Sequence, residues 1–162
     1  MIHPDCAAMI NAHLPLELKA SHAYLRMALE ANARGFFGVE KFFQAASLEE
    51  QGHLRKLIGF INDYDMANSI PAIDEMPQGT TDIRSMFVAA LGMEQAVSAS
   101  FNAILNCADD ECKDFQTVAF ILPMQADQTD SEIEIRDILN YLDNVAVGNL
   151  AEFDEYVGDL VK

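Results

Sequence analysis

Apolar residues recur at helical spacing along four long stretches of the chain and one short one. Residues three, four or seven positions apart share one face of a helix, so this spacing marks the side that packs inward. In the first stretch, part of the apolar stripe consists of Leu14, Leu18, Leu25 and Leu29. The pattern predicts an all-α chain whose helices span about residues 5–33, 39–66, 82–107, 112–144 and 150–161.

Proline, glycine and capping residues mark where these helices bend or end. Pro15 either kinks the first helix or lies in the first turn of a helix that begins there. The segment 34–38 carries two glycines and is a short break before the second helix. Asp82 is a suitable N-cap for the third helix, Pro123 predicts a bend in the fourth, and residues 108–111 form a short polar turn.

The lengths of the connections predict how the helices run. The turns after the first and third helices are short, so each of these helices forms an antiparallel pair with the next one. The connection over residues 69–81 reaches about 43 Å at ~3.3 Å per residue, which is the full length of such a helix at ~1.5 Å per residue. We therefore expect the second and third helices to run parallel. The result is a four-helix bundle with one long crossover and a short fifth C-terminal helix.

Composition restricts the class of protein. The chain has 162 residues, of which 51% are hydrophobic and 22% charged, and it is expected to form a single domain over residues 1–162. Its 26 acidic and 10 basic residues give a net charge of −16, which argues against nucleic-acid binding because phosphates would be repelled. The same charge suits a protein that attracts cations, and it equally suits an acidic surface kept for solubility.

Neither export nor membrane insertion is indicated. No apolar run approaches the ~18 residues of a membrane span, and residues 1–5 do not resemble the start of a secretory signal. The cysteines are odd in number and match no structural zinc spacing; they are Cys6, Cys107 and Cys112. Reduced thiols in a cytoplasmic compartment are the simplest interpretation.

Glu50 and His53 are the first candidates for chemistry, because they lie three residues apart inside the second helical stretch. Residues at this spacing share a helix face and can bind one metal ion together. An isolated pair of this kind is a weak signal, since surface helices often carry one. Whether this pair indicates a metal site depends on which residues the other helices place beside it.

Polar residues on the other helices fall at the same depth in the bundle. Glu17 and Glu50 are equally far from the first turn, and Glu94 and Gln128 are equally far from the third, about 25 Å in each case at ~1.5 Å per residue. Because these two turns lie at opposite ends of the bundle, all four positions converge near its middle. Bare carboxylates would be strongly destabilising there, whereas bound divalent cations would neutralise them.

The ligand set predicts a pair of divalent cations. Glu50 would bridge them, with Glu17 and His53 on one cation and Glu94 on the other. Oxygen-rich ligation with a single imidazole suits iron or manganese better than zinc, and open coordination positions would admit dioxygen. Tyr24 lies two turns after Glu17 on the same face. It either hydrogen-bonds a ligand or supplies an electron, or it is a core tyrosine with a satisfied hydroxyl.

The sequence resembles the ferritins over almost the whole chain. Residues 16–25 are similar to the first-helix motif of that family, and residues 49–53 to its second-helix motif. Residues 93–95 resemble the third-helix glutamate site, and Gln128 matches the glutamine of the ferroxidase centre. The crossover and the tail helix add to the resemblance.

The resemblance implies a ferritin-like bundle and a function in iron storage. A ferritin of this kind oxidises Fe(II) with dioxygen at a di-iron centre within one subunit, and the ferric product mineralises inside a hollow homo-oligomeric shell of 24 subunits. The residues that the resemblance assigns to the centre are Glu17, Tyr24, Glu50, His53, Glu94 and Gln128.

The fourth helix departs from the pattern of many relatives. Residues 128–131 read Gln-Thr-Asp-Ser where those relatives carry a second E-x-x-H. The second iron would then have fewer protein ligands, as in animal heavy-chain ferritins. Ser131 and Glu132 are the candidates to supply another ligand, and the sequence does not decide between them.

Three further positions bear on haem and on iron uptake. Gln51 stands where haem-binding bacterioferritins have a methionine, so no haem is expected. Val118 and Ile121 fall where animal ferritins line their threefold channels with acidic residues. This argues against iron uptake by that route.

Similarity to bacterial ferritins also implies a third iron site at Glu49, Asp127 and Asp130. The alternative is that these carboxylates belong to a solvated face of a very acidic protein. The remaining histidines, His3, His13 and His22, have no evident partner at ligand spacing. A packed or surface role is favoured for His13.

Three other classes of protein fit part of the pattern. A non-catalytic storage or structural shell subunit would require an incomplete centre. A di-iron or manganese oxidase acting on an organic substrate would be a defined monomer or dimer without a mineral core. A DNA-protecting mini-ferritin would build its iron site across a subunit interface and would usually lack the tail helix.

Overall fold

The computed structural model describes residues 1–70, 72–74 and 82–161. Its elements are α1 (Pro4–Ala33), α2 (Phe37–Asp63), α3 (Ile83–Asn106), the π-helical turn η1 (Cys107–Glu111), α4 (Phe115–Asn144) and α5 (Leu150–Leu160). The described residues contain no strand, which confirms the all-α prediction.

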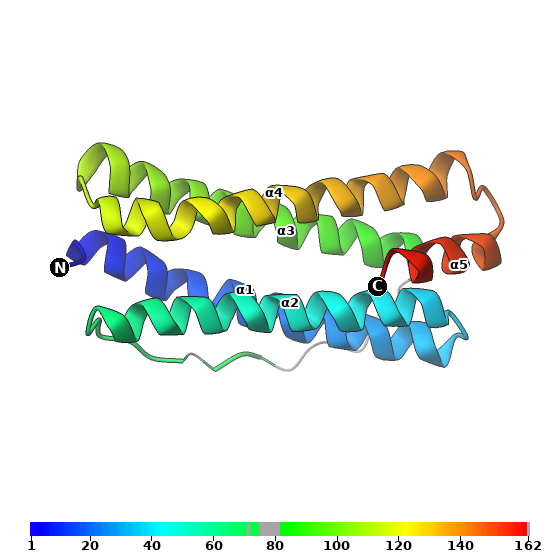
Figure 1. Ribbon diagram of the computed structural model, residues 1–162. Coiled ribbons are helices and arrows are strands. Elements are labelled where there is room, and N and C mark those ends of the chain that lie inside the picture. The colour runs from blue at the N-terminus through cyan, green and yellow to red at the C-terminus, as the bar shows by residue number, and fades with distance from the viewer. Residues whose placement is uncertain (71, 75–81, 162) are drawn as a thin grey trace.

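The four long helices form an elongated bundle, and α5 packs at one end of it (Figure 1). α1 and α4 run in one direction and α2 and α3 in the other, so α2 ends and α3 begins at opposite ends of the bundle (Figure 1). This arrangement confirms the expected parallel pair of helices. Of the crossover predicted over residues 69–81, residues 71 and 75–81 lie outside the described part of the chain.

The helices begin and end within three residues of the predicted bounds, although α2 already begins inside the break expected over residues 34–38. Asp82 is the N-cap of α3 and accepts a hydrogen bond of 2.9 Å from the backbone N–H of Ser85. α1, however, is continuous through Pro15, so no helix begins there. The polar turn expected over residues 108–111 is instead a π-helical continuation of α3. It is closed by a hydrogen bond of 2.8 Å from Cys112 N to Cys107 O.

The predicted apolar stripe of α1 is wrong in its second half. Leu25 and Leu29 are 43% and 74% exposed. The buried side of this half consists of small residues together with one aromatic residue and one methionine: Ala20, Ser21, Ala23, Tyr24, Met27, Ala28 and Ala31. Small side chains let neighbouring helices approach closely, so an alanine face packs inward while larger leucines point outward.

The hydrophobic core is divided into two clusters along the length of the bundle. On every long helix, the residues of one cluster precede a buried polar residue and those of the other follow it. These polar residues are Glu17, Glu50, Glu94 and Gln128, one from each helix. The four positions therefore converge in a polar layer at mid-length, as the spacing predicted.

α5 caps the N-terminal end of α2 by accepting hydrogen bonds from its backbone N–H groups. No side chain at the N-cap of α2 bonds its free N–H groups. Instead Asp154 of α5 accepts hydrogen bonds from Gly38 N at 3.1 Å and Val39 N at 2.8 Å, which satisfies two donors at the positive end of the helix dipole. A Cβ atom on Gly38 would lie 1.9 Å from the carbonyl oxygen of Asp154, so this contact requires glycine.

Within the described residues, the helical stretch Ile83–Glu111 is long and apolar enough to cross a membrane by length and composition alone. The sequence prediction that no such stretch exists is therefore wrong by this criterion. In the structure, α3 packs against α1 and α4 and buries nine of its residues within the bundle. Core helices commonly pass the same test.

Candidate metal centre

Three ligand side chains meet in the polar layer: Glu17 from α1, and Glu50 and His53 from α2. One ligand atom of each lies within 4.8 Å of the other two. His53 Nδ1 is 3.3 Å from Glu50 Oε2 and 3.7 Å from Glu17 Oε2. Both carboxylates are buried, while His53 is partly exposed. The i, i+3 spacing thus places Glu50 and His53 beside the buried carboxylate of Glu17, as predicted.

The second carboxylate oxygen of Glu17 is an unsatisfied buried acceptor. Glu17 Oε2 has no hydrogen-bond partner among the described residues, although the side chain is fully buried. A buried polar atom without a partner is destabilising, and at 3.7 Å His53 is too far away to satisfy it. A cation between Glu17, Glu50 and His53 would supply the missing interaction, so these residues fit a metal ion.

His13 holds the other oxygen of Glu17, which the sequence analysis did not foresee. His13 Nε2 is 2.8 Å from Glu17 Oε1, and His13 Nδ1 is 2.8 Å from Ser100 Oγ. The ring is buried and stacks on Phe101 with 4.2 Å between the ring centres. The packed role favoured for His13 is confirmed, whereas the absence of a partner is wrong. The i, i+4 spacing to Glu17 was the signal for this contact.

Glu94 lies beside this group and is held by two donors. The Tyr24 hydroxyl donates to Glu94 Oε1, and Gln128 Nε2 donates to Glu94 Oε2. Gln128 Nε2 also donates to the backbone carbonyl of Glu94 at 3.1 Å, while its buried Oε1 atom has no partner in the described part of the chain. Glu94 is outside the ligand group formed by the other three residues. To bind a second cation, Glu94 would have to give up its hydrogen bond with Tyr24 or with Gln128.

Protons balance the charges of this centre. Interaction with the nearby carboxylates of Glu17 and Glu50 raises the pKa of His53 to about 10. Burial raises the pKa of Glu50 to about 9 and also raises the pKa of Glu94. Burial opposes ionisation of Glu17, but its hydrogen bond with His13 and its electrostatic interactions with His53 and Glu50 outweigh this effect and hold its pKa below the usual range. At neutral pH an imidazolium therefore pairs with the Glu17 carboxylate, and Glu50 is neutral.

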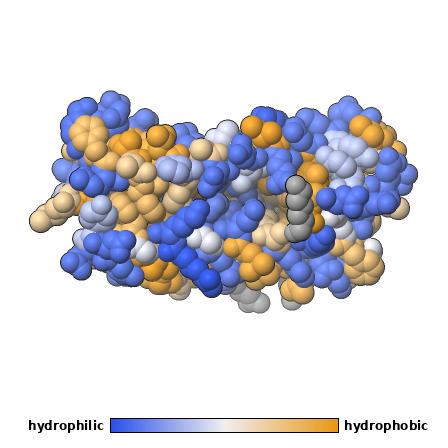
Figure 2. Space-filling model, viewed as in Figure 1, coloured by the Kyte–Doolittle hydropathy of each residue, from blue (hydrophilic) through white to orange (hydrophobic). Residues whose placement is uncertain are grey.

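An open cavity of about 580 Å³ lies between α2 and α4, and His53 is part of its wall. Figure 2 shows hydrophilic residues across the middle of this face of the bundle. The other lining residues are Glu49, Gly52, Lys56, Asp127, Asp130, Ser131 and Glu134. The three residues of the predicted third site therefore line one cavity beside the centre. One of them, Asp127, also lies 3.6 Å from the ammonium group of Lys56. Their role in iron binding stays a prediction.

Ser131 and Glu132 of α4, the candidates for an additional ligand of the second iron, make other hydrogen bonds. Ser98 Oγ donates a hydrogen bond to Glu132, and Ser131 Oγ donates to the backbone carbonyl of Asp127 at 3.3 Å.

Ile121 is buried in the core and Val118 packs against the same cluster. In the single chain these two residues therefore serve packing.

A helical bundle with one long crossover and a carboxylate-rich layer at its middle is the architecture of the ferritin-like metal-binding proteins. The chain matches the Ferritin-like domain over residues 7–145. It belongs to the ferritin family.

Bacterial proteins are among its relatives. The chain is 25% identical, over 99% of its own length and 98% of the relative, to a Haemophilus influenzae protein described as a probable bacterial non-heme ferritin-like protein. It is 26% identical to a bacterial non-heme ferritin of Staphylococcus aureus, over 90% of this chain and 87% of the relative. These matches confirm the resemblance to non-haem bacterial ferritins.

Proposed function

We propose that this chain is the subunit of an iron-storage ferritin that oxidises Fe(II) with dioxygen. Membership of the ferritin family and the names of the relatives support the storage of iron. The observation that carries the oxidation step is the buried group of Glu17, Glu50 and His53, in which Glu17 Oε2 lacks a partner.

Fe(II) is the substrate in this proposal. It reaches the centre through the cavity between α2 and α4, whose carboxylates attract cations. Glu17 and His53 bind one Fe(II) ion, Glu94 binds a second with Gln128 beside it, and Glu50 bridges the two. His53 and Glu50 lose their protons as the ions bind.

Each of the two Fe(II) ions gives one electron to dioxygen, which is thereby reduced by two electrons. The protons released by the ligands are available to the reduced oxygen. The carboxylates stabilise the ferric product until it leaves for the inner wall of a shell, where mineral grows. Tyr24 keeps Glu94 in place through its hydroxyl group.

The proposed assembly is a homo-oligomeric shell of 24 subunits in the cytoplasm, without haem. Exposed leucines on the outer faces of α1 and α2 support burial against neighbouring copies: Leu25, Leu29 and Leu48. Gln51 donates a hydrogen bond of 3.3 Å to Ser21 Oγ and offers no sulfur ligand to a haem iron. The mass of the native particle in solution tests the number of subunits.

The Glu50→Ala variant tests the oxidation step. It should lose rapid oxidation of Fe(II), followed by absorbance after mixing with oxygenated buffer, while its assembly stays intact. Glu40→Ala is the matched control, because Glu40 lies on the same helix near its N-terminal end.

Three results would contradict the proposal. A normal rate in Glu50→Ala would place the oxidation elsewhere. Wild-type protein that oxidises Fe(II) no faster than buffer would favour a non-catalytic shell subunit. A defined monomer or dimer that forms no mineral would favour an oxidase acting on an organic substrate.

A further inference from the structure

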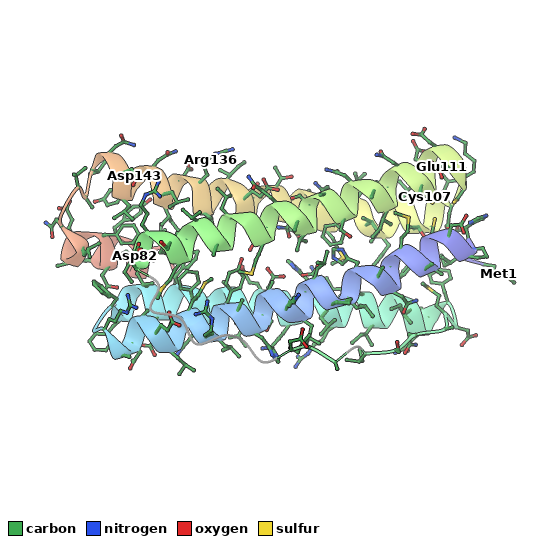
Figure 3. The ribbon with its side chains drawn as sticks, turned by 180° about the vertical axis from the view of Figure 1, so that it is seen from behind. Met1, Asp82, Cys107, Glu111, Arg136 and Asp143 are labelled. Atoms are coloured by element: carbon green, nitrogen blue, oxygen red, sulfur yellow. The ribbon has the colours of Figure 1, made fainter. Side chains whose placement is uncertain are left out.

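A second group of ligand atoms lies at the end of the bundle where α1 begins. The sulfur atoms of Cys6, Cys107 and Cys112 are all within 4.8 Å of one another. The Sγ–Sγ distance is 3.9 Å between Cys6 and Cys107 and 3.0 Å between Cys107 and Cys112. All three thiols are free. Figure 3 shows Cys107 at the same end of the bundle as Met1 and Glu111.

The chain builds this group from two segments that are distant in sequence. Cys6 lies in the first turns of α1, about a hundred residues before the other two cysteines. Cys107 and Cys112 are five residues apart, and the π-type hydrogen bond from Cys112 N to Cys107 O brings them to one side of the turn. An α-helix would not place residues at this spacing side by side, so the sequence alone did not reveal the cluster.

His3 adds an imidazole at the edge of the cluster. His3, Asp5 and Cys112 form a second group of ligand atoms within 4.8 Å, which shares Cys112 with the first group. The backbone N–H of His3 donates a hydrogen bond of 2.7 Å to Asp114, the N-cap of α4, and this fixes the segment before α1 against α4. The side chain of His3 is 42% exposed. A cation can therefore approach from solvent, although Cys6 and Cys107 are buried.

We propose that Cys6, Cys107, Cys112 and His3 form a binding site for a thiophilic divalent cation, Zn²⁺. Three sulfur ligands and one imidazole are a common set for tetrahedral zinc, and Zn–S bonds of ~2.3 Å place the sulfur atoms about 3.8 Å apart. Cys6 and Cys107 are already at that separation. Cys112 would move by about 1 Å; it is the C-cap of η1, and its side chain is partly exposed.

The cluster would select a different cation from the centre at mid-length. Thiolate ligands favour zinc over Fe(II), and the order of stability of divalent complexes points the same way, whereas carboxylate-rich sites suit iron. Zn²⁺ would bind the sulfur atoms as thiolates and displace their protons.

The same geometry suggests one competing chemistry, a disulfide between Cys107 and Cys112. Their sulfur atoms are 3.0 Å apart, against ~2.05 Å in a disulfide. A disulfide would use only two of the three thiols and would leave Cys6 and His3 without a role. The experiment must therefore separate metal binding from oxidation.

Co²⁺ titration of the reduced protein without oxygen is the test, because Co²⁺ substitutes for zinc and reports its ligands by absorption. The wild-type protein should develop thiolate-to-cobalt charge-transfer absorption in the near ultraviolet, with intense visible bands of tetrahedral cobalt. One equivalent of Zn²⁺ per chain should abolish both. Cys112→Ser and Cys6→Ala should each lose the charge-transfer absorption, and His3→Ala should retain it with shifted visible bands.

Two variants serve as controls. Asp110→Asn changes an exposed acidic residue of the same turn and should keep the full spectrum. Glu50→Ala should also keep the charge-transfer absorption, which separates this site from the proposed ferroxidase centre. If Cys6→Ala does not fold, Cys112→Ser decides the result because its side chain is partly exposed.

Three outcomes would overturn the proposal: no charge-transfer absorption in the wild-type protein, the same absorption in Cys112→Ser, or Zn²⁺ that fails to displace the cobalt. Uptake of Co²⁺ with the spectrum of oxygen ligands alone counts as the first outcome. Formation of a Cys107–Cys112 disulfide in air, detected as a loss of two hydrogens in mass with no metal uptake by the reduced protein, would assign the cluster to redox chemistry instead.

Discussion

The imidazole of His13 lies 2.8 Å from Glu17 Oε1 and leaves Glu17 Oε2 as the free oxygen of that carboxylate. The other ring nitrogen of His13 lies 2.8 Å from Ser100 Oγ on α3, so the ring is fixed from both sides. Glu17 Oε2 is thereby directed toward His53 at 3.7 Å. A residue one turn earlier on the same helix therefore orients a candidate metal ligand.

We predict that His13→Ala weakens Fe(II) binding by roughly 10- to 100-fold, the usual effect of removing a residue that orients a metal ligand. Anaerobic titration with Fe(II) measures the affinity, and the initial rate of oxidation should fall at low Fe(II) concentration. His22→Ala is the matched control because His22 is an exposed histidine of the same helix. Equal losses in the two variants would contradict a positioning role for His13.

Tyr24→Phe should destabilise the chain and slow the oxidation of Fe(II). The Tyr24 hydroxyl is buried and donates to Glu94, so its removal leaves a buried acceptor with one donor fewer, which costs about 1–3 kcal/mol in the free energy of unfolding. Chemical denaturation measures this change. Tyr64→Phe, at a partly exposed position, should change neither quantity. A stable Tyr24→Phe variant with a reduced oxidation rate would instead favour electron supply by Tyr24.

Binding of Fe(II) should release protons, and its affinity should rise with pH. The pKa values of His53 and Glu50 are raised to about 10 and about 9, so both groups are protonated at pH 7 in the metal-free chain. A metal ion binds their deprotonated forms, so about two protons leave the centre. Since the free protein holds more protons than the bound one, raising the pH shifts the equilibrium toward binding.

Anaerobic calorimetry of Fe(II) binding in two buffers with different heats of ionisation counts these protons. His53→Ala should release one proton fewer than the wild-type protein. Identical heats in the two buffers would show that the centre is already deprotonated.

Gly38→Ala should destabilise the contact between α2 and α5. The new methyl group would lie 1.9 Å from the Asp154 carbonyl oxygen, and both atoms belong to the helix backbones or are fixed to them. The free energy of unfolding should fall by about 1–3 kcal/mol, measured by chemical denaturation. Gly59→Ala is the control on the same helix, because among the described residues no atom of another element lies within 4 Å of its added Cβ. It should be neutral or stabilising by up to about 1 kcal/mol. Equal effects in both variants would contradict close packing at Gly38.

The sequence predicted the position of the polar layer well, because the relevant geometry runs along the helices. Glu50 and His53 are neighbours by helical spacing, and the matched distances of Glu17 and Glu94 from the turns follow from the constant rise of a helix. The bundle topology followed from connection lengths in the same way. Each of these inferences needs only the position of a residue along the chain.

The inferences that failed needed knowledge of packing. Leu25 and Leu29 are more apolar than the alanines beside them, yet the alanines are buried in the core and the leucines are exposed. The Cys107–Cys112 contact depends on a π-turn, and its partner Cys6 comes from the other end of the chain. Neither feature leaves a periodic mark in the sequence.

Each apolar cluster stabilises one end of the bundle. The polar layer between them depends on polar contacts instead. The cavity between α2 and α4 also opens beside this polar layer. A cation bound by residues of α1, α2 and α3 would therefore hold these three helices together at mid-length. Amide hydrogen exchange should slow around Glu50 and Glu94 when cations bind, while the two ends keep their rates.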